Sequence, residues 1–485
     1  MLDERKISIS KIEDSKKGYP QRPPFYPPVI YPELKHLNIQ LETDENNQVY
    51  EAVRNSFILM GLDSDNYMSK KWNPLAEIIK SGECVVIKPN FVLDRNRNDR
   101  TSQSTITHGS VIRAIIDYVI LALQGHGKVI VADAPQMNCD FDRLIRKNGM
   151  KAVIDYYQEQ LRDTDIVVDL IDLRQERTIY KHGIVWERIH LKGDPLGYTI
   201  VDLKEDSELK GVDSKRFYGA DYNRRETIAA HSKGHHRYFV SNTILNADVV
   251  ISVPKLKVHR KVGVTLNIKN MVGINGNKNY LVHYQVGTQS QGGDEFSIES
   301  RQAIFDRLIK DITLGKSWKY GKYLYAAYLK GKELLKIKEK SGQNKAGDWY
   351  GNDTAWRMAV DLNRVLLYSG KNGMPLKEKR RYLSVIDGIV GGEGEGPLAS
   401  TPVRSGVIIA GTNPVAADLV ATAYMGLDYK RIKSLNIKEK TEKRLMNFCK
   451  NDIEIIGNEN GHMKGVDHFR GVYKYKVPSG WKGYL

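Results

Sequence analysis

The chain has 485 residues, of which 41% are hydrophobic and 27% charged, a composition typical of a globular protein with two or three packed lobes. Residues 1–17 contain no apolar leader, and no run approaches the roughly 18 apolar residues that span a bilayer, so we expect a cytoplasmic protein. The net charge of +16 favours anionic partners, namely nucleic acid, anionic lipid or phosphorylated metabolites, without choosing among them.

The first two thirds of the chain predict alternating helices and strands. Residues 1–35 are polar and rich in proline, which predicts an extended arm without helix or strand. In the following core segment, 36–314, apolar spacing predicts helices at 49–60, 111–123 and 143–161, and strands at 84–88, 128–132, 166–173 and 248–253. We therefore expect an α/β fold in two lobes, with a mostly parallel sheet flanked by helices.

The last third of the chain predicts three further segments. Residues 315–345 hold nine lysines against two glutamates, with aromatic residues interleaved, and predict a lysine-rich helical insertion. Residues 346–430 predict the second part of the core, with apolar runs at 382–386 and 407–410 and a small-residue helix at 414–425. Residues 431–485 predict a charged C-terminal segment, in which a helix is followed by glycine-rich loops.

Polar residues that directly follow the predicted strands are the best candidates for a functional site. In an open parallel sheet, ligands bind outside the carboxyl ends of the strands. Lysine ammonium groups supply positive charge to a phosphate or carboxylate, and asparagine amides supply directional hydrogen bonds. The candidates for substrate binding are Lys88, Asn90, Lys255, Lys257 and Asn270. The sequence therefore predicts a site for an anionic small molecule, although any single lysine could be a solvated surface charge.

Catalytic and metal-binding candidates lie among the same motifs. His259 and His108 could act as general bases or as metal ligands, because imidazole titrates near neutrality, and Lys269 could orient the substrate. Either histidine could instead be structural. A divalent cation such as Mg²⁺ could be held by the carboxylates of Asp133, Asp387, Glu393 and Glu395. Acidic residues beside glycines are otherwise common in turns.

Other cofactors are not supported by the sequence. Cys84, Cys139 and Cys449 are widely spaced and form no CxxC pair, so we expect no iron–sulfur cluster. The glycine run 391–397 lacks the Gly-Lys-Ser/Thr ending of a phosphate-binding loop and does not match GxGxxG, so we expect neither ATP hydrolysis nor NAD binding.

Together the motifs resemble the signature of the domain of unknown function 362 family, in its order, over residues 84–428. They are IKPN at 87–90, TH at 107–108, VADAP at 131–135, PKLKVH at 254–259, LNIKNMVG at 266–273 and DGIVGGEGEGP at 387–397. Some members of that family carry a ferredoxin-like segment, whose cysteines this chain lacks.

A fainter resemblance is to the nickel-pincer lactate racemase family. Lys257, His259 and Lys269 would be the analogous positions in this chain. That family relies on several histidines around its cofactor, whereas this chain offers Asp133 after its second predicted strand. The resemblance therefore does not imply nickel, and it implies only a site that can hold a charged small molecule.

Two functions from different classes are compatible with these features. One is an enzyme acting on a phosphate- or carboxylate-bearing small molecule by acid/base or racemase/epimerase-like chemistry. The alternative, based on 315–345, is a peripheral membrane or polyanion-binding protein at the inner membrane face, working with polymer- or lipid-linked substrates. Nucleic acid is not favoured, because no recognised binding motif accompanies the charge. The enzyme interpretation requires that its candidate side chains line one pocket, and it fails if they do not. These are Lys88, His108, Asp133, Lys255, His259, Lys269 and Asp387.

Overall fold

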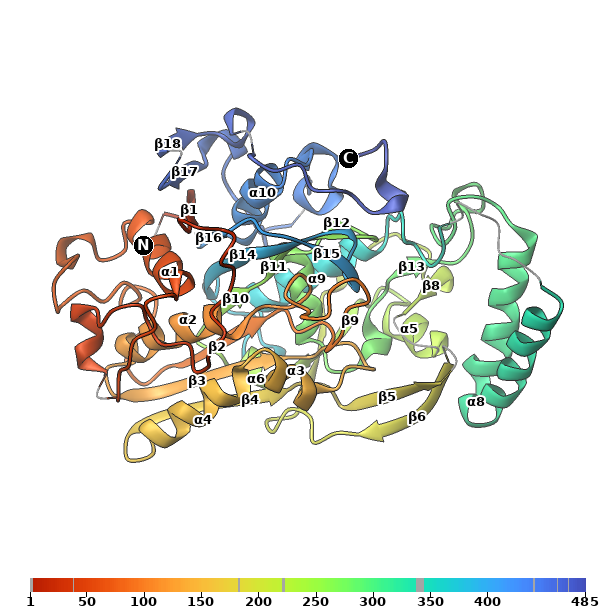
Figure 1. Cartoon of the computed structure of the whole chain (residues 1–485). Coiled ribbons are helices and arrows are strands. Elements are labelled where there is room, and N and C mark those ends of the chain that lie inside the picture. The colour runs from red at the N-terminus through yellow and green to blue at the C-terminus, as the bar shows by residue number, and fades with distance from the viewer. Residues whose placement is uncertain are drawn as a thin grey trace.

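The computed structural model describes residues 3–37, 39–181, 184–219, 223–336, 344–438, 441–459, 461–469 and 471–485. Within this part of the chain, 12 strands form one sheet (Figure 1). They are β1 (Lys6–Lys11), β2 (Cys84–Pro89), β3 (His126–Asp133), β4 (Asp165–Asp172), β10 (Val249–Val253), β11 (Lys255–His259), β12 (Gly263–Val264), β14 (Arg381–Glu395), β15 (Ala399–Val403), β16 (Val407–Gly411), β17 (Glu454–Gly457) and β18 (Gly461–Lys464).

The sheet is mostly parallel, as predicted. Its order is β18-β17-β1-β16-β14-β10-β2-β3-β4, with β11 and β15 paired to β14, and β12 paired to β11. Strands β4, β3, β2, β10 and β14 run parallel to one another, whereas β16 is antiparallel to both β14 and β1. The carboxyl ends of the parallel strands therefore meet at one edge of the sheet, where ligands of α/β proteins usually bind.

Helices cover both faces of the sheet. On one face pack α1 (Gln48–Leu59), α2 (Gly109–Leu123) and α4 (Met150–Gln160), and on the other α7 (Leu266–Asn270), α9 (Ala355–Tyr368) and α10 (Pro414–Tyr424). Successive side chains of a strand point to opposite faces of the sheet. In β2, Val85 and Ile87 pack into the core under α1, α2 and α4, and Val86 packs into the core under α7, α9 and α10. Burial on both faces explains why these strands are continuous apolar runs in the sequence.

Four expectations about secondary structure are wrong. The arm 1–35 contains β1, which lies between β16 and β17 because Ile7 and Ile9 alternate into the core before the prolines begin. The expected helix 143–161 is two helices, α3 (Phe141–Lys147) and α4, which are separated at Gly149, where φ is +80°.

The third and fourth of these errors concern the carboxyl-terminal half. Residues 391–395 of the glycine run 391–397 belong to β14, which pairs with β15, so this part of the run is a strand and not a loop. The described residues after 430 hold short 3₁₀ turns and the β17–β18 hairpin, with no α-helix of the kind expected for this charged segment.

Smaller elements extend the molecule away from the sheet. Two-stranded sheets are formed by β5 (Glu176–Lys181) with β6 (Ile184–His190), β7 (Tyr198–Asp202) with β9 (Arg237–Ser241), and β8 (Phe217–Tyr218) with β13 (Tyr284–Gln285). Helices α5 (Arg224–Ala230) and α6 (Asn242–Leu245) lie among them. None of the described helices has both the length and the apolar character needed to cross a bilayer.

The lysine-rich insertion lies in α8 (Arg301–Leu334), at the right of Figure 1 beyond β5 and β6. The Tyr328 hydroxyl donates to the Asp306 carboxylate over 2.5 Å, and the Lys332 amine lies 2.6 Å from the same carboxylate. A straight helix would separate residues 22 apart by about 33 Å, so α8 folds back on itself as a hairpin. The helical structure thus begins before residue 315, and residues 337–343 of the expected insertion lie outside the described residues.

Candidate functional site

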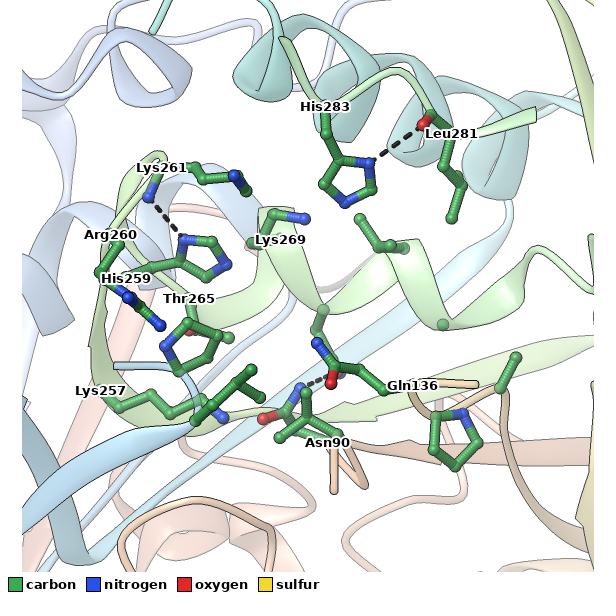
Figure 2. A pocket seen from close by; sticks show the side chains of 18 of the residues that line it. Asn90, Gln136, Lys257, His259, Arg260, Lys261, Thr265, Lys269, Leu281 and His283 are labelled. Atoms are coloured by element: carbon green, nitrogen blue, oxygen red, sulfur yellow. Dashed lines mark hydrogen bonds between the residues drawn. The ribbon is translucent and has the colours of Figure 1, made fainter. Parts of the chain in front are cut away.

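A cavity of about 270 Å³ lies at the carboxyl ends of β2 and β3, under α7 (Figure 2). Asn90 after β2, and Asp133 and Gln136 at the end of β3, line one side of it. Most of its polar lining comes from a single stretch of chain, residues 257–283, which we call the site segment. The topology of the sheet therefore places one continuous segment over the edge where the parallel strands end.

A buried ion pair forms the floor beneath the cavity, in which Asp133 lines the cavity and Lys88, a predicted substrate-binding residue, lies behind it and does not. The Lys88 amine lies 2.8 Å from Asp133 Oδ1, and neither side chain is more than 3% exposed. Asp133 also accepts the backbone N–H of Phe91 over 2.7 Å, and the Lys88 amine donates to Asn270 Oδ1 over 3.1 Å. Burial lowers the pKa of Lys88, and the Asp133 carboxylate opposes this shift. The floor is thus neutral overall and internally paired.

Gly273 allows the site segment to pass directly over this ion pair. A Cβ atom at this position would lie 1.9 Å from Asp133 Oδ1 and 2.7 Å from the Lys88 amine. Any side chain would therefore displace the pair, which gives a physical reason for glycine at the end of the LNIKNMVG motif.

Lys269 projects into the cavity from α7 without a partner. Its side chain is only 9% exposed, and its amine makes no hydrogen bond or ion pair with any described residue. Burial, followed by the nearby cations of Lys261 and Lys278, lowers the pKa of Lys269 to about 7. The amine is therefore in part uncharged at neutral pH and can act as a base or as a nucleophile.

Helix α7 is held by a carboxylate beneath its first turn. Asp418 of α10 accepts the backbone N–H groups of Asn267 and Ile268 over 2.8 and 2.9 Å, and the Asn267 amide over 2.8 Å. Leu266, at the start of the helix, has φ at +43°, a conformation that is rare for a non-glycine residue. These contacts fix the short helix and hence the direction of Lys269.

Two histidines at the cavity are held in opposite tautomers. His259 Nδ1 accepts the backbone N–H of Lys261 over 3.0 Å, so its neutral ring carries the proton on Nε2. His283 Nδ1 lies 3.0 Å from the Leu281 carbonyl, which can only accept, so Nε2 of His283 keeps a free lone pair. Burial and the Lys269 amine lower the pKa of both rings well below 6.5, which keeps them neutral.

The remaining wall of the cavity carries more cations than anions. The Lys257 amine donates to the carbonyl of Thr105, and the Lys278 amine donates to the carbonyl of Ala134 over 2.8 Å. Burial lowers the pKa of Lys257 well below its usual value and that of Lys278 to about 7. Arg260 and Lys261 share the carboxylate of Asp348, at 3.4 and 2.8 Å.

Two buried oxygen atoms on the lining also lack partners in the described part of the chain. They are Asn90 Oδ1 and the hydroxyl of Thr265. Buried polar atoms are almost always hydrogen-bonded, so these two atoms are exceptions among the described residues.

Three predicted site residues meet elsewhere, at a second buried network. Asp387 lies 3.0 Å from the Lys255 amine and accepts the Tyr19 hydroxyl over 2.6 Å and the His108 backbone N–H over 3.0 Å. The Tyr19 ring stacks on the His108 ring at 4.0 Å. Burial, and then the Lys255 charge, lowers the pKa of His108 to about 3. His108 caps α2 and, like Lys255 and Asp387, does not line the cavity.

The four carboxylates proposed as metal ligands are not brought together. Asp133 and Asp387 belong to the two ion pairs above, whereas Glu393 and Glu395 accept the backbone N–H groups of Lys476 and Ser479 over 2.9 and 2.7 Å. The two glutamates therefore fasten the C-terminal segment to β14. Among the described residues, no three His, Cys, Asp or Glu side chains cluster closely enough to hold a metal ion.

Several cavity residues were not anticipated from the sequence. His283 and Lys278 follow the family motifs in an irregular loop, where no periodicity marks them, and Thr265 lies between two motifs. Their only signal in the sequence is proximity along the chain to Lys257, His259 and Lys269.

Comparison with known proteins identifies a family without an assigned activity. The family described as a domain of unknown function (DUF362) matches residues 85–189 and 203–423, more than half of the chain. All the cavity residues named above lie within these ranges. No curated protein matches the chain. Nothing in these comparisons supports the fainter resemblance to the lactate racemase family.

Proposed function

The chain belongs to the domain of unknown function 362 family, whose description names no activity, and we propose from the cavity that it is an enzyme acting on an anionic small molecule. The ligand would carry a phosphate or a carboxylate, and the chemistry would be acid/base transfer of a proton, as in a racemase or epimerase. The observation that carries the proposal is the amine of Lys269, which has no partner among the described residues, on a cavity lined by more basic than acidic side chains.

An anion would relieve the electrostatic cost of this arrangement. Lys257, Lys269 and Lys278 are all buried, and the pKa of each is lowered because a charged amine is poorly solvated there. A phosphate or carboxylate beside them would restore their protonation and form charge-assisted hydrogen bonds. The side chains of Asn90 and Thr265 line the same cavity and add polar character to it.

The groups needed to move a proton lie on the same cavity. The partly neutral amine of Lys269 can accept a proton near neutral pH, and the free Nε2 lone pair of the neutral His283 ring can take one up transiently during the reaction. The Nε2–H of His259 can donate a hydrogen bond to a developing negative charge. On the basis of this arrangement we assign ligand binding or catalysis to Lys257, His259, Lys269, Asn90 and Asn270. We propose that Lys88 and Asp133 support the cavity from beneath.

Calorimetric titration with inorganic phosphate and with pyruvate tests the binding step. Lys269→Met should weaken binding by at least about tenfold, which is about 1.4 kcal/mol, because a charged hydrogen-bond donor is lost. Lys128→Met is the matched control, since Lys128 is exposed at the opposite end of β3 and should leave binding unchanged. Absence of saturable binding by the wild type, or equal binding by Lys269→Met, would reject the anion site.

A second candidate function concerns the α8 hairpin. Apolar side chains that are 51 to 77% exposed, namely Phe305, Ile312, Tyr320, Tyr323 and Leu324, lie on it beside the exposed lysines Lys319 and Lys330. Apolar side chains combined with lysines favour adsorption to an anionic bilayer, at about 1 kcal/mol for each lysine near the surface. We propose that this hairpin docks the enzyme on such a membrane.

Sedimentation with lipid vesicles tests this second function. The protein should pellet with phosphatidylcholine vesicles that contain phosphatidylserine, less so at high salt, and Leu324→Asp should weaken pelleting several-fold. Met374→Asp changes a side chain of similar exposure, 66%, outside the hairpin and should have no effect. Equal pelleting of Leu324→Asp and the wild type would rule the hairpin out.

A further inference from the structure

We propose that Lys269 captures the carbonyl carbon of a small 2-oxo acid as a covalent imine. The inference rests on the proposed anion site, and it adds a substrate class and a nucleophile to it. A 2-oxo acid carries both the anion that the cations of the wall could bind and a carbon atom that an amine can attack. The requirements are an amine without a partner, a base, and a donor for the carbonyl oxygen.

The placement of Lys269 meets the first requirement. Its amine is buried, has no hydrogen bond or ion pair within the described residues, and is surrounded by the cations of Lys261 and Lys278. Neighbouring positive charge and poor solvation both favour the neutral, nucleophilic form of an amine. Lys88, Lys255 and Lys257 differ from it, since each of their amines already donates to a carboxylate or a carbonyl.

The two histidines meet the other requirements. In the view of Figure 2 the Lys269 side chain lies between the rings of His259 and His283. Its charge acts on both rings, because it lowers the pKa of each. His283 offers its Nε2 lone pair, and His259 offers its Nε2–H. The opposite tautomers therefore supply a base and a donor on the same cavity.

The proposed step is balanced as follows. The lone pair of the neutral Lys269 amine forms the C–N bond while the π electrons of the C=O bond move onto oxygen, which the His259 N–H stabilises. His283 Nε2 carries one amine proton to that oxygen, which gives a carbinolamine. In the second stage the nitrogen forms the C=N bond, and the hydroxyl leaves with the second amine proton as water. The net change is amine plus ketone or aldehyde to imine plus water, without an oxidant.

Reductive trapping tests the inference on the full-length protein. Glyoxylate and cyanoborohydride should convert an imine at Lys269 into a stable carboxymethyl group, which peptide mass spectrometry locates. The exposed Lys128 in the same digest is an internal reference, and Lys269 should react at least about tenfold faster because much more of it is uncharged at pH 7. His283→Phe should slow labelling of Lys269, since it removes the base.

Binding and labelling of the wild type, measured together, separate this inference from the proposed function. The anion site requires only saturable binding of pyruvate and phosphate, whereas the imine also requires that Lys269 be labelled faster than the exposed Lys128. Labelling of Lys269 no faster than that of Lys128, in a wild type that binds both anions, would overturn the imine and leave the anion site standing. Failure of the wild type to bind either anion would reject the proposed function itself.

Discussion

At the scale of single residues, the lysines at the carboxyl edge of the sheet differ in the partners of their amines. Lys88 and Lys255 each face a buried aspartate, whereas Lys269 faces the cavity and its amine has no partner in the described part of the chain. The sequence places all three directly after apolar strands or motifs, and nothing in it distinguishes them. The distinction depends on whether a carboxylate from a distant strand, Asp133 or Asp387, reaches the amine. The sequence could therefore indicate which residues gather at this edge but not which lysine is left unpaired.

The unpaired amine should make folding depend on pH. The pKa of Lys269 is near 10.5 in the unfolded chain and about 7 in the folded protein. The unfolded chain thus binds more protons between these values, so the stability of the ligand-free protein should rise with pH across this window, by about 1.4 kcal/mol per pH unit for one such group. Below pH 7 the cost of the buried charge is fully present.

Urea unfolding at several pH values between 7 and 9 measures this effect. Lys269→Met should lower the slope of unfolding free energy against pH by about 1.4 kcal/mol per unit, and it should be the more stable protein at pH 7. Lys128→Met should keep the slope of the wild type. Parallel slopes for Lys269→Met and the wild type would mean that the amine is charged in the folded protein.

At the scale of elements, strands were easier to predict than the short helix that carries the site. Apolar runs that are buried on both faces mark β2, β3, β10 and β16 clearly. Helix α7 has five residues, too few for a periodic pattern, and it depends on Asp418, which lies 151 residues from Asn267.

Loss of this support should affect both stability and the site. Asp418→Asn places an amide donor against the N–H groups of α7, and we expect a loss of about 1 to 3 kcal/mol in unfolding free energy. Phosphate affinity of the folded protein should also fall, because Lys269 is no longer held in place. Asp361→Asn is the control, since Asp361 is equally buried but binds Ser207 and Tyr238. If both variants lose stability and retain affinity, Asp418 does not position the site.

At the scale of the whole molecule, both terminal regions are tied to the middle of the chain. Strand β1 joins the central sheet, and Tyr19 reaches the Asp387 network. Near the other end, the Trp481 indole donates to the carbonyl of Arg260 over 2.5 Å, beside the cavity. Local composition in these regions is polar and interrupted by proline or glycine, so it predicted an arm and a charged segment. The contacts that order them join residues hundreds of positions apart, which no local pattern reveals.

The site segment, residues 257–283, has a consequence for how such a protein can diversify. It supplies His259, Lys269, Lys278 and His283, whereas the neutral floor beneath it belongs to the strands. Replacement of one short stretch of gene could therefore change what the cavity accepts and leave the sheet intact. The same property makes the segment a suitable unit for grafting between homologues. Such a graft must keep Gly273, which passes over the ion pair, and Asn267, which donates to Asp418.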